Sequence, residues 1–287
     1  MSDSPLKPRV AFQGERGAFS EEAAVKLLGE HIELVPRATF ESLFAAIGEG
    51  AADLALAPIE NSLVGSIQRS YDLLLESSLH ISGEVIIPIE HYLIGCPGSS
   101  FDSIRTVESH PVALAQCSRF FAAYPNLRRI ATEDTAGSVR AVLAASDPAR
   151  ASIAGSHAAS YYGGRILREH LEDHSENYTR FVLLTAKEEM RARADKLSLV
   201  MKLQHRPGAL NHALASFAGR GIDLLKIESR PIRGRPWEYH FYLDLQASTE
   251  EAEAAQALEE LRARALDVRV LGCYPSAPLH QQEDLHR

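Results

Sequence analysis

Short apolar runs alternate with helix-like patterns along the first two thirds of the chain. Residues 9–13 and 53–58 are mostly apolar and are expected to be buried strands. Residues 40–48 and 66–77 place apolar side chains three and four apart, which predicts helices that cover those strands. Strands that alternate with helices predict an α/β fold with largely parallel sheets. In open sheets of that kind, ligands bind beyond the carboxyl ends of the strands.

Capping residues mark where several of these helices begin. Ser20 stands before Glu21 and Glu22, and acids in a first turn complement the helix dipole, so we expect Ser20 to be a cap. Pro111 is expected at the first position of a helix, where its missing N–H costs nothing. Asp134 is expected to open the next helix.

The last third of the chain has a different order of elements. In chain order, the pattern predicts a strand at 196–204, a helix at 208–218, strands at 222–231 and 237–245, a helix that ends near 265, and a strand at 268–274. Ser248 and Glu251 have the spacing of a capping box for the second helix. The order β-α-β-β-α-β predicts a ferredoxin-like domain.

The two parts are expected to meet in a charged connector. Residues 187–196 carry dense charge of both signs without apolar periodicity, so we expect the domain boundary there. Residues 276–287 are expected to be a polar, poorly packed tail.

Composition narrows the class of protein. With 287 residues, 45% hydrophobic and 24% charged, the chain is long enough for one large or two ordinary globular domains. Its net charge of -8 argues against a nucleic-acid surface. It has no apolar stretch of the length of a membrane span and no signal-peptide pattern at its start. Three cysteines without CxxC spacing indicate reduced thiols, and we expect a cytoplasmic protein with no membrane contact.

Several familiar chemical motifs are absent from the sequence, among them GxGxxG, the P-loop, HExxH and GxSxG. The turn Gly14–Gly17 follows a strand. Its glycines either let the backbone approach an anion or are needed only because the turn is tight. His170 and His174 are four residues apart, but no third ligand is evident, and the segment also fits a solvated helical face. We expect no metal and no cofactor.

Four polar clusters stand where predicted strands pass into loops or helices. They are residues 58–62, 108–117, 134–139 and 177–181. Each offers hydroxyls, amides or backbone N–H groups, as a site for a small carboxylate ligand requires. Each one taken alone is also compatible with ordinary helix capping.

Together, these clusters match a known family. The chain resembles a monofunctional prephenate dehydratase, and its last third resembles the ACT regulatory domain of that family. The catalytic motifs that match are residues 11–20, 58–62, 109–117, 134–139 and 179–181, and the ACT motifs are 208–210, 228–231 and 272–275. The resemblance covers about residues 8 to 275 and keeps the usual order.

The resemblance implies an architecture. A two-lobed domain like a periplasmic binding protein is expected over residues 8–186, with one lobe formed by 8–80 plus 165–186 and the other by 81–164. A ferredoxin-like ACT domain is expected over 197–275. Because ACT domains share interfaces, a homodimer or homotetramer is expected.

The resemblance also implies a reaction, the conversion of prephenate to phenylpyruvate, water and carbon dioxide. Its barrier lies in expelling hydroxide, so the enzyme needs a hydrogen-bond donor there and anchors for two carboxylates. Thr179 matches the essential threonine and is expected to donate to the departing hydroxyl. Glu60 is the alternative acid, if burial keeps it protonated.

Other matched residues are expected to bind the substrate. Asn61, Ser62 and Gln116 would supply neutral hydrogen bonds. The helix start Thr135, Ala136, Gly137 and Ser138 would hold a carboxylate on free N–H groups. Arg180 offers positive charge, although its neighbour Thr179 then points to the other face of the strand. Phe181 is expected in the pocket wall or the core.

In the second domain, the resemblance implies an effector site for phenylalanine at a subunit interface. Its residues would be Gly208, Ala209, Leu210, Glu228, Ser229 and Arg230, and end-product inhibition would follow from a two-state equilibrium. Two alternatives stay open: arogenate dehydratase, which keeps the fold and changes the substrate, and a non-catalytic sensor of aromatic amino acids.

Overall fold

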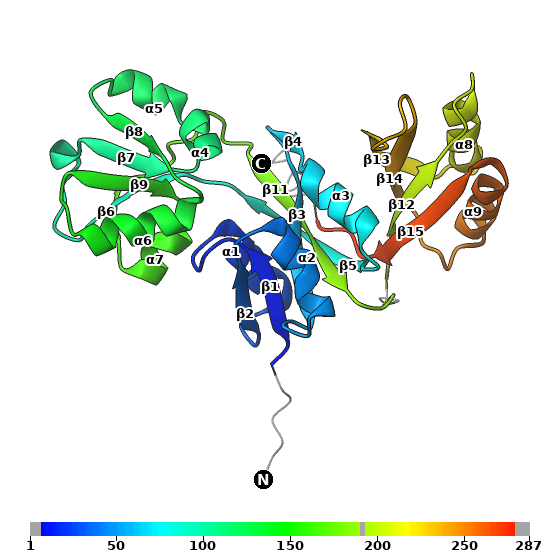
Figure 1. Ribbon diagram of the computed structural model, residues 1–287, viewed down its shortest axis with the longest axis horizontal. Coiled ribbons are helices and arrows are strands. Elements are labelled where there is room, and N and C mark those ends of the chain that lie inside the picture. Colours follow the sequence, from blue (N-terminus) through cyan, green and yellow to red (C-terminus); the bar gives the residue numbers. More distant parts are fainter. Residues whose placement is uncertain (1–6, 190–192, 279–287) are drawn as a thin grey trace, which may run out of the picture. The chain divides into compact units, whose positions relative to one another are not determined.

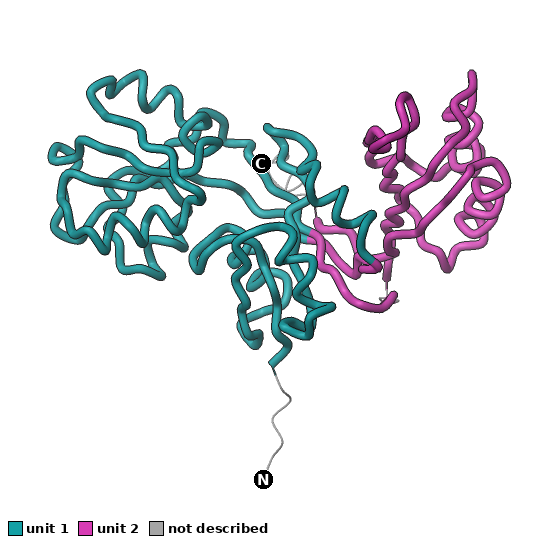
Figure 2. Tube along the Cα trace, in the orientation of Figure 1, with its two compact units in different colours: residues 1–77, 85–181 teal, residues 78–84, 182–287 magenta. Residues whose placement is uncertain are grey.

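The computed structural model describes residues 7–189 and 193–278. The chain divides into two compact units, Met1–Ser77 with Val85–Phe181 and Ser78–Glu84 with Val182–Arg287 (Figure 2). This division passes through two strands, and the expected domain boundary at 187–196, of which residues 190–192 lie outside the described part, stays a prediction. Most of the expected polar tail, residues 279–287, lies outside it too.

The first sheet has the order β2-β1-β3-β11-β5, with the short β4 paired to β3. Its strands are β1 (Arg9–Gln13), β2 (Glu33–Arg37), β3 (Leu54–Asn61), β4 (Gly65–Ser66), β5 (His80–Pro88) and β11 (Tyr178–Thr185). Its helices are α1 (Phe19–Leu28), α2 (Phe40–Gly48) and α3 (Gln68–Glu76). β1 runs parallel to both β2 and β3, as expected for strands joined by helices.

The second sheet has the order β10-β6-β9-β7-β8. Its strands are β6 (Tyr92–Gly95), β7 (Thr106–Ser109), β8 (Arg128–Ala131), β9 (Arg150–Ala154) and β10 (Arg165–Arg168). Its helices are η1 (Phe101–Ser103), α4 (Pro111–Gln116), α5 (Ser118–Ala123), α6 (Thr135–Ala145) and α7 (Ser156–Tyr162). Whereas β7 is parallel to β8 and β9, β6 is antiparallel to β9 and β10.

Helices cover both faces of this second sheet (Figure 1). Leu93 and Ile153 belong to a buried cluster with residues of α4 and α5. Their neighbours Ile94 and Ala154 belong to another cluster, with residues of α6 and α7. Because successive side chains of a strand point to opposite faces, each strand needs apolar residues at consecutive positions. This explains why these strands read as continuous apolar runs.

Sheet membership differs from the expected lobe boundaries at two strands. β5 was expected to open the second lobe, but it pairs within the first sheet. β10 was expected in the first lobe, but it pairs antiparallel to β6 in the second sheet. The chain therefore passes between the two sheets after residue 88 and again after residue 168.

The second unit contains a ferredoxin-like domain, as predicted. Its elements are β12 (Lys196–Lys202), α8 (Ala209–Ala218), β13 (Asp223–Pro231), β14 (Tyr239–Gln246), α9 (Ala252–Arg264) and β15 (Asp267–Tyr274). The strands pair antiparallel in the order β13-β14-β12-β15. One buried cluster, which includes Leu199, Phe217 and Leu261, joins the sheet to both helices.

Local capping explains why some predicted helix starts are correct and two are not. Thr39 and Ser42 form a reciprocal capping box, and α2 spans the predicted residues. Ser20 is not a cap, because α1 already begins at Phe19 and Ser20 is buried in its first turn. α9 begins at Ala252, while Glu251 still accepts a bond from the Ser248 N–H at 3.3 Å. No helix in the described ranges is long and apolar enough to cross a bilayer.

Candidate active site

Asn61, at the end of β3, joins three predicted motif residues. Its side-chain Nδ2 donates to Asn177 Oδ1 at 2.8 Å, to the Tyr178 carbonyl at 3.0 Å and to Thr179 Oγ1 at 3.0 Å. Its Oδ1 accepts the backbone N–H groups of Leu63 and Val64, both at 3.0 Å. Asn177 is fully buried and Thr179 is 8% exposed. One amide therefore orients the end of β3 against the start of β11.

Ser62 reinforces the same junction. Its hydroxyl donates to the Glu176 carbonyl at 3.0 Å and accepts the Tyr178 N–H at 2.9 Å. Both of its hydrogen-bonding roles are thus used within the protein, so Ser62 holds the loop before β11 in place.

Glu60 and Arg180 form an ion pair on the same two strands. Arg180 Nη1 lies 3.8 Å from Glu60 Oε2, and the side chains are 11% and 35% exposed, respectively. Each residue is the strand neighbour of a member of the Asn61–Thr179 pair, so the two pairs face opposite sides of the sheet. The burial on which an acid role for Glu60 depends is incomplete.

A cavity of about 450 Å³ lies beside this network. It is lined by Leu63, Val64, Val112, Ala115, Gln116, Glu172, Asp173 and His174. Of the predicted site residues, Gln116 lines it directly. Leu63 and Val64 connect it to Asn61, which accepts their N–H groups. The motifs around residues 61, 116 and 179 therefore converge on one region, although they are far apart in sequence.

The segment with two histidines has a different structure from the expected helix. Residues 169–177 form a loop, and His170 has a φ of 52°. Glu172 accepts the backbone N–H of His91 at 2.7 Å, while Asp173 caps α5 through the N–H groups of Ser118 and Arg119. No group of three or more metal-binding side chains occurs among the described residues. The segment lines the cavity and is not a solvated helical face.

His91 is a site residue that the sequence analysis missed. Its ring Nε2 lies 2.9 Å from Gln116 Oε1, and the residue is 1% exposed. Burial lowers the pKa of His91, although the bond to Gln116 opposes that shift. A lone histidine between two apolar strands carries no recognisable motif, so only the contact with Gln116 identifies it.

At the start of α6, the Gly137 N–H is not free for a ligand as was expected. Asp134 Oδ1 already accepts the Gly137 N–H at 2.5 Å, so the helix is capped by its own carboxylate. Ala136 is fully buried. A carboxylate of the substrate would be repelled by the negative charge of Asp134. The expectation that the Gly137 N–H would bind the substrate was therefore wrong.

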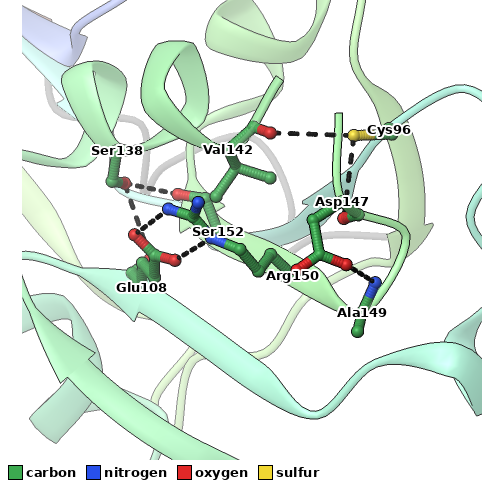
Figure 3. Close-up of polar contacts among 8 residues, drawn as sticks. All are labelled: Cys96, Glu108, Ser138, Val142, Asp147, Ala149, Arg150 and Ser152. Carbon is green, nitrogen blue, oxygen red and sulfur yellow. Dashed lines mark hydrogen bonds and ion pairs between the residues drawn. The ribbon is translucent and has the colours of Figure 1, made fainter. Parts of the chain in front are cut away.

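Ser138 points into the second sheet and away from solvent. It is 2% exposed, donates to the Thr135 carbonyl at 2.6 Å and contacts the Ser152 hydroxyl. Figure 3 shows this contact beside the ion pair of Glu108 with Arg150, whose Nε lies 2.6 Å from Glu108 Oε1. The Ser138 side chain therefore serves the packing of α6. Phe181 is likewise core, at 2% exposure.

The turn Gly14–Gly17 binds a carboxylate of the protein itself. Gly14 and Gly17 have φ of 109° and 83°, conformations that favour glycine. Glu21 Oε2 accepts the Gly17 N–H at 2.8 Å and the Arg16 Nε at 2.8 Å, and Oε1 lies 3.5 Å from His157 Nε2. Burial alone would raise the pKa of Glu21, but these bonds hold it at about 2.

In the second unit, two adjoining hollows of about 190 and 110 Å³ lie at the start of α8. Ala209 lines both, and Leu210 lines the smaller one with Trp237 and Phe241. Gly208 precedes them at φ 78°. Glu228, Ser229 and Arg230 lie on β13, opposite Tyr242, Phe241 and His240 of β14. Phe241 is thus the link between the two predicted effector motifs.

Comparison with known proteins agrees with both parts of this description. The family model for prephenate dehydratase matches residues 10–189, and that for the ACT domain matches residues 197–263. The chain is 43% identical to arogenate dehydratase/prephenate dehydratase 1, chloroplastic, of Arabidopsis thaliana, over 94% of this chain and 72% of the relative.

Two solved structures cover nearly the whole chain. Prephenate dehydratase of Arthrobacter aurescens in complex with L-Phe has a TM-score of 0.85 at 31% identity, over 96% of this chain and 91% of that one. The quorum quenching acylase GqqA has a TM-score of 0.86 at 32% identity, over 94% and 98%.

Proposed function

The chain belongs to the prephenate dehydratase family, and on that premise we propose that it is a hydro-lyase that converts prephenate to phenylpyruvate, water and carbon dioxide. The observation that carries the proposal is the hydrogen bond from Asn61 Nδ2 to Thr179 Oγ1, 118 positions apart in sequence. It brings together two motifs that the family requires beside a cavity of suitable size for a small dicarboxylate.

The reaction assigns a specific task to Thr179. Loss of carbon dioxide and hydroxide makes the ring aromatic, so the reaction is downhill and the barrier lies in the departure of hydroxide. Asn61 donates to Thr179 Oγ1, so the threonine's own hydrogen is not used in that bond. Thr179 then donates this hydrogen to the departing hydroxyl, and the bond strengthens as negative charge develops there.

Glu60 and Arg180 have a supporting role in this proposal. The Glu60 side chain is 35% exposed and faces a guanidinium, so it lacks the apolar enclosure that a neutral carboxylic acid requires. We therefore assign the donor role to Thr179. Arg180 and Glu60 pair with each other on the face of the sheet opposite Thr179, so we assign this pair a structural role and not a direct contact with the substrate.

The second unit supports regulation by phenylalanine. A relative of the same fold is named for its complex with L-Phe. In this chain, the hollow lined by Ala209, Leu210 and Phe241 is partly apolar and lies at the start of a helix. We assign it to phenylalanine, bound between copies of this chain, with residues 208–210 and 228–230 forming the site. Occupancy inhibits the catalytic domain, residues 8–186, by shifting a two-state equilibrium.

Arogenate is a second candidate substrate, because a similar protein is named for it. The relative at 43% identity is named for both arogenate and prephenate. Arogenate differs from prephenate in carrying an amino group in place of the keto group. The same Thr179 chemistry would therefore convert arogenate to phenylalanine.

The cellular setting belongs to the same proposal. All three cysteines are free and buried, which fits a reducing compartment, and we place the protein in the cytoplasm. A homodimer or homotetramer fits a shared ACT interface.

Product formation from prephenate and, separately, from arogenate tests the proposal, with and without phenylalanine. Phenylpyruvate from prephenate, at a rate reduced by phenylalanine, is the expected result. Turnover of arogenate alone would change the substrate and keep the site. No turnover of either substrate by a protein that still binds phenylalanine would favour a sensor.

A further inference from the structure

The imidazole of His91 is buried where the chain passes from the first sheet to the second. The residue is 1% exposed and lies in the passage between β5 and β6. Its backbone N–H donates to Glu172 Oε2 at 2.7 Å, and its carbonyl accepts the Leu171 N–H at 2.9 Å. The ring of Phe19 lies edge-on, 6.0 Å from its centroid. The backbone of His91 is therefore fixed to residues 171 and 172, and its ring is enclosed by the protein.

The two ring nitrogens of His91 have unequal surroundings. Nε2 lies 2.9 Å from Gln116 Oε1, whereas Nδ1 is buried and has no hydrogen-bond partner among the described residues. A buried polar atom without a partner is costly and calls for an explanation. A histidine retained at such a cost must be needed for what Nε2 does.

These surroundings decide where the single proton of a neutral imidazole lies. A proton on Nε2 donates to Gln116 Oε1 and leaves only a lone pair unsatisfied at Nδ1. A proton on Nδ1 would be a buried donor without an acceptor, and orphaned donors are rarer in proteins than under-satisfied acceptors. The Nε2–H form is therefore favoured, and it also fixes which end of the Gln116 amide faces His91.

Gln116 is thereby left with its amide N–H groups for the cavity. It lines the cavity, and in the described part of the chain its amide nitrogen has no other partner. A free glutamine amide would present its oxygen or its nitrogen with similar ease. With Oε1 bound to His91, Gln116 presents only donors to the cavity, and donors suit the oxygen atoms of the substrate in the proposed function.

We propose that His91 is a positioning residue for Gln116: it donates Nε2–H to the amide oxygen and so directs the amide N–H groups toward an oxygen of the bound substrate. The identity of that substrate rests on the proposed function.

A double-mutant cycle in the full-length protein tests this role. His91→Leu is expected to lower kcat/KM for prephenate by roughly tenfold to hundredfold, the scale of a misplaced binding group. His91→Gln, which keeps an N–H donor near the same place, is expected to recover part of the loss. In a Gln116→Ala background, His91→Leu is expected to cause no further loss. Losses that multiply in the double variant would overturn the inference.

A second measurement does not depend on turnover or on tolerance of His91→Leu. Nitrogen-15 NMR of labelled histidines in the wild-type protein, assigned by the signal missing in His91→Gln, reports the tautomer directly. A proton on Nε2 is expected, and a proton on Nδ1 would overturn the inference. If the wild-type protein fails to turn over prephenate, the proposed function fails, while the tautomer still decides the role of His91.

Discussion

Asn61 donates its side-chain amide to Thr179 Oγ1 over 3.0 Å, and the two residues stand on neighbouring strands of one sheet. The same amide also bonds Asn177 and the Tyr178 carbonyl. The threonine hydroxyl is therefore oriented by residues that belong to the fold. Orientation before the substrate arrives is what makes a weak donor effective, because no reorganisation is needed during the reaction.

Thr179→Val should abolish most of the activity without unfolding the protein. Valine fills nearly the same volume but has no hydroxyl, so we expect kcat to fall about 10²–10³-fold, as for the loss of one preorganised donor. Thr179→Ser keeps the hydroxyl and should retain more activity than valine. Steady-state kinetics with thermal melts checks this. Equal losses in the two variants would contradict a donor role.

Asn61→Ala should cost stability as well as activity. The change removes the acceptor for two backbone N–H groups and a donor shared by three acceptors, so we expect a loss of about 2–4 kcal/mol. Asn61→Asp keeps Oδ1 for Leu63 and Val64 but places a charged oxygen against the three acceptors of the amide. Urea unfolding should therefore show a loss of stability for Asp as well. If Asn61→Ala were as stable as the wild type, the hydrogen bonds of Asn61 would contribute nothing to the free energy of unfolding.

Glu21 should make folding sensitive to acid. Its pKa in the folded state is about 2, below the ordinary value of 4.5, so it stabilises the fold above about pH 4.5 and this contribution fades as the pH falls toward 2. Glu21→Gln should thus lose about 1–3 kcal/mol at pH 7 and progressively less toward pH 3.

The neighbouring Glu22 provides the matched control for that experiment. Burial raises the pKa of Glu22, so its charge opposes folding at neutral pH, and Glu22→Gln should not lose stability at pH 7. Urea unfolding from pH 7 to pH 3 measures both variants. A pH-independent loss in Glu21→Gln would show that packing, and not the charge, is what matters there.

Gly208→Ala should weaken phenylalanine inhibition while leaving the uninhibited rate in place. Gly208 has a φ of 78°, and an added Cβ would lie 3.1 Å from the His212 ring beside the hollow assigned to phenylalanine. Gly234→Ala is the matched control, because Gly234 has a φ of 75° but open space around it. Both changes carry a backbone cost of about 1–2 kcal/mol. Inhibition curves that shift equally in both variants would assign the effect to backbone strain alone.

Lys196 and Glu84 form a buried ion pair, and the loss of one partner alone should destabilise the fold more than the loss of both. Lys196 Nζ lies 2.5 Å from Glu84 Oε1, and the side chains are 11% and 0% exposed. Lys196→Met removes this cation from beside a buried carboxylate and should cost about 3–5 kcal/mol, whereas Lys196→Met with Glu84→Leu should recover much of that loss. Melting temperatures of the variants measure this. A double variant as unstable as Lys196→Met would contradict it.

Most of the elements that depend on near neighbours in the sequence were predicted correctly. α2 spans residues 40–48 because its apolar spacing and its Thr39 cap act within a few positions. The ferredoxin-like order of the second unit follows from strand alternation and helical spacing in the same way. Ser20 failed as a cap because a serine before two acids has the same pattern inside a first turn as at its boundary.

What the sequence determined by itself is the set of elements and the chemistry available in each motif, because periodicity, capping and family motifs are written in consecutive residues. Only the tertiary structure decided which groups meet. In the folded protein, the Gly137 N–H donates to Asp134, Ser138 is buried in the core and His91 contacts Gln116. These outcomes depend on which strands become neighbours across long stretches of chain, and that choice is made by the packing of the whole domain.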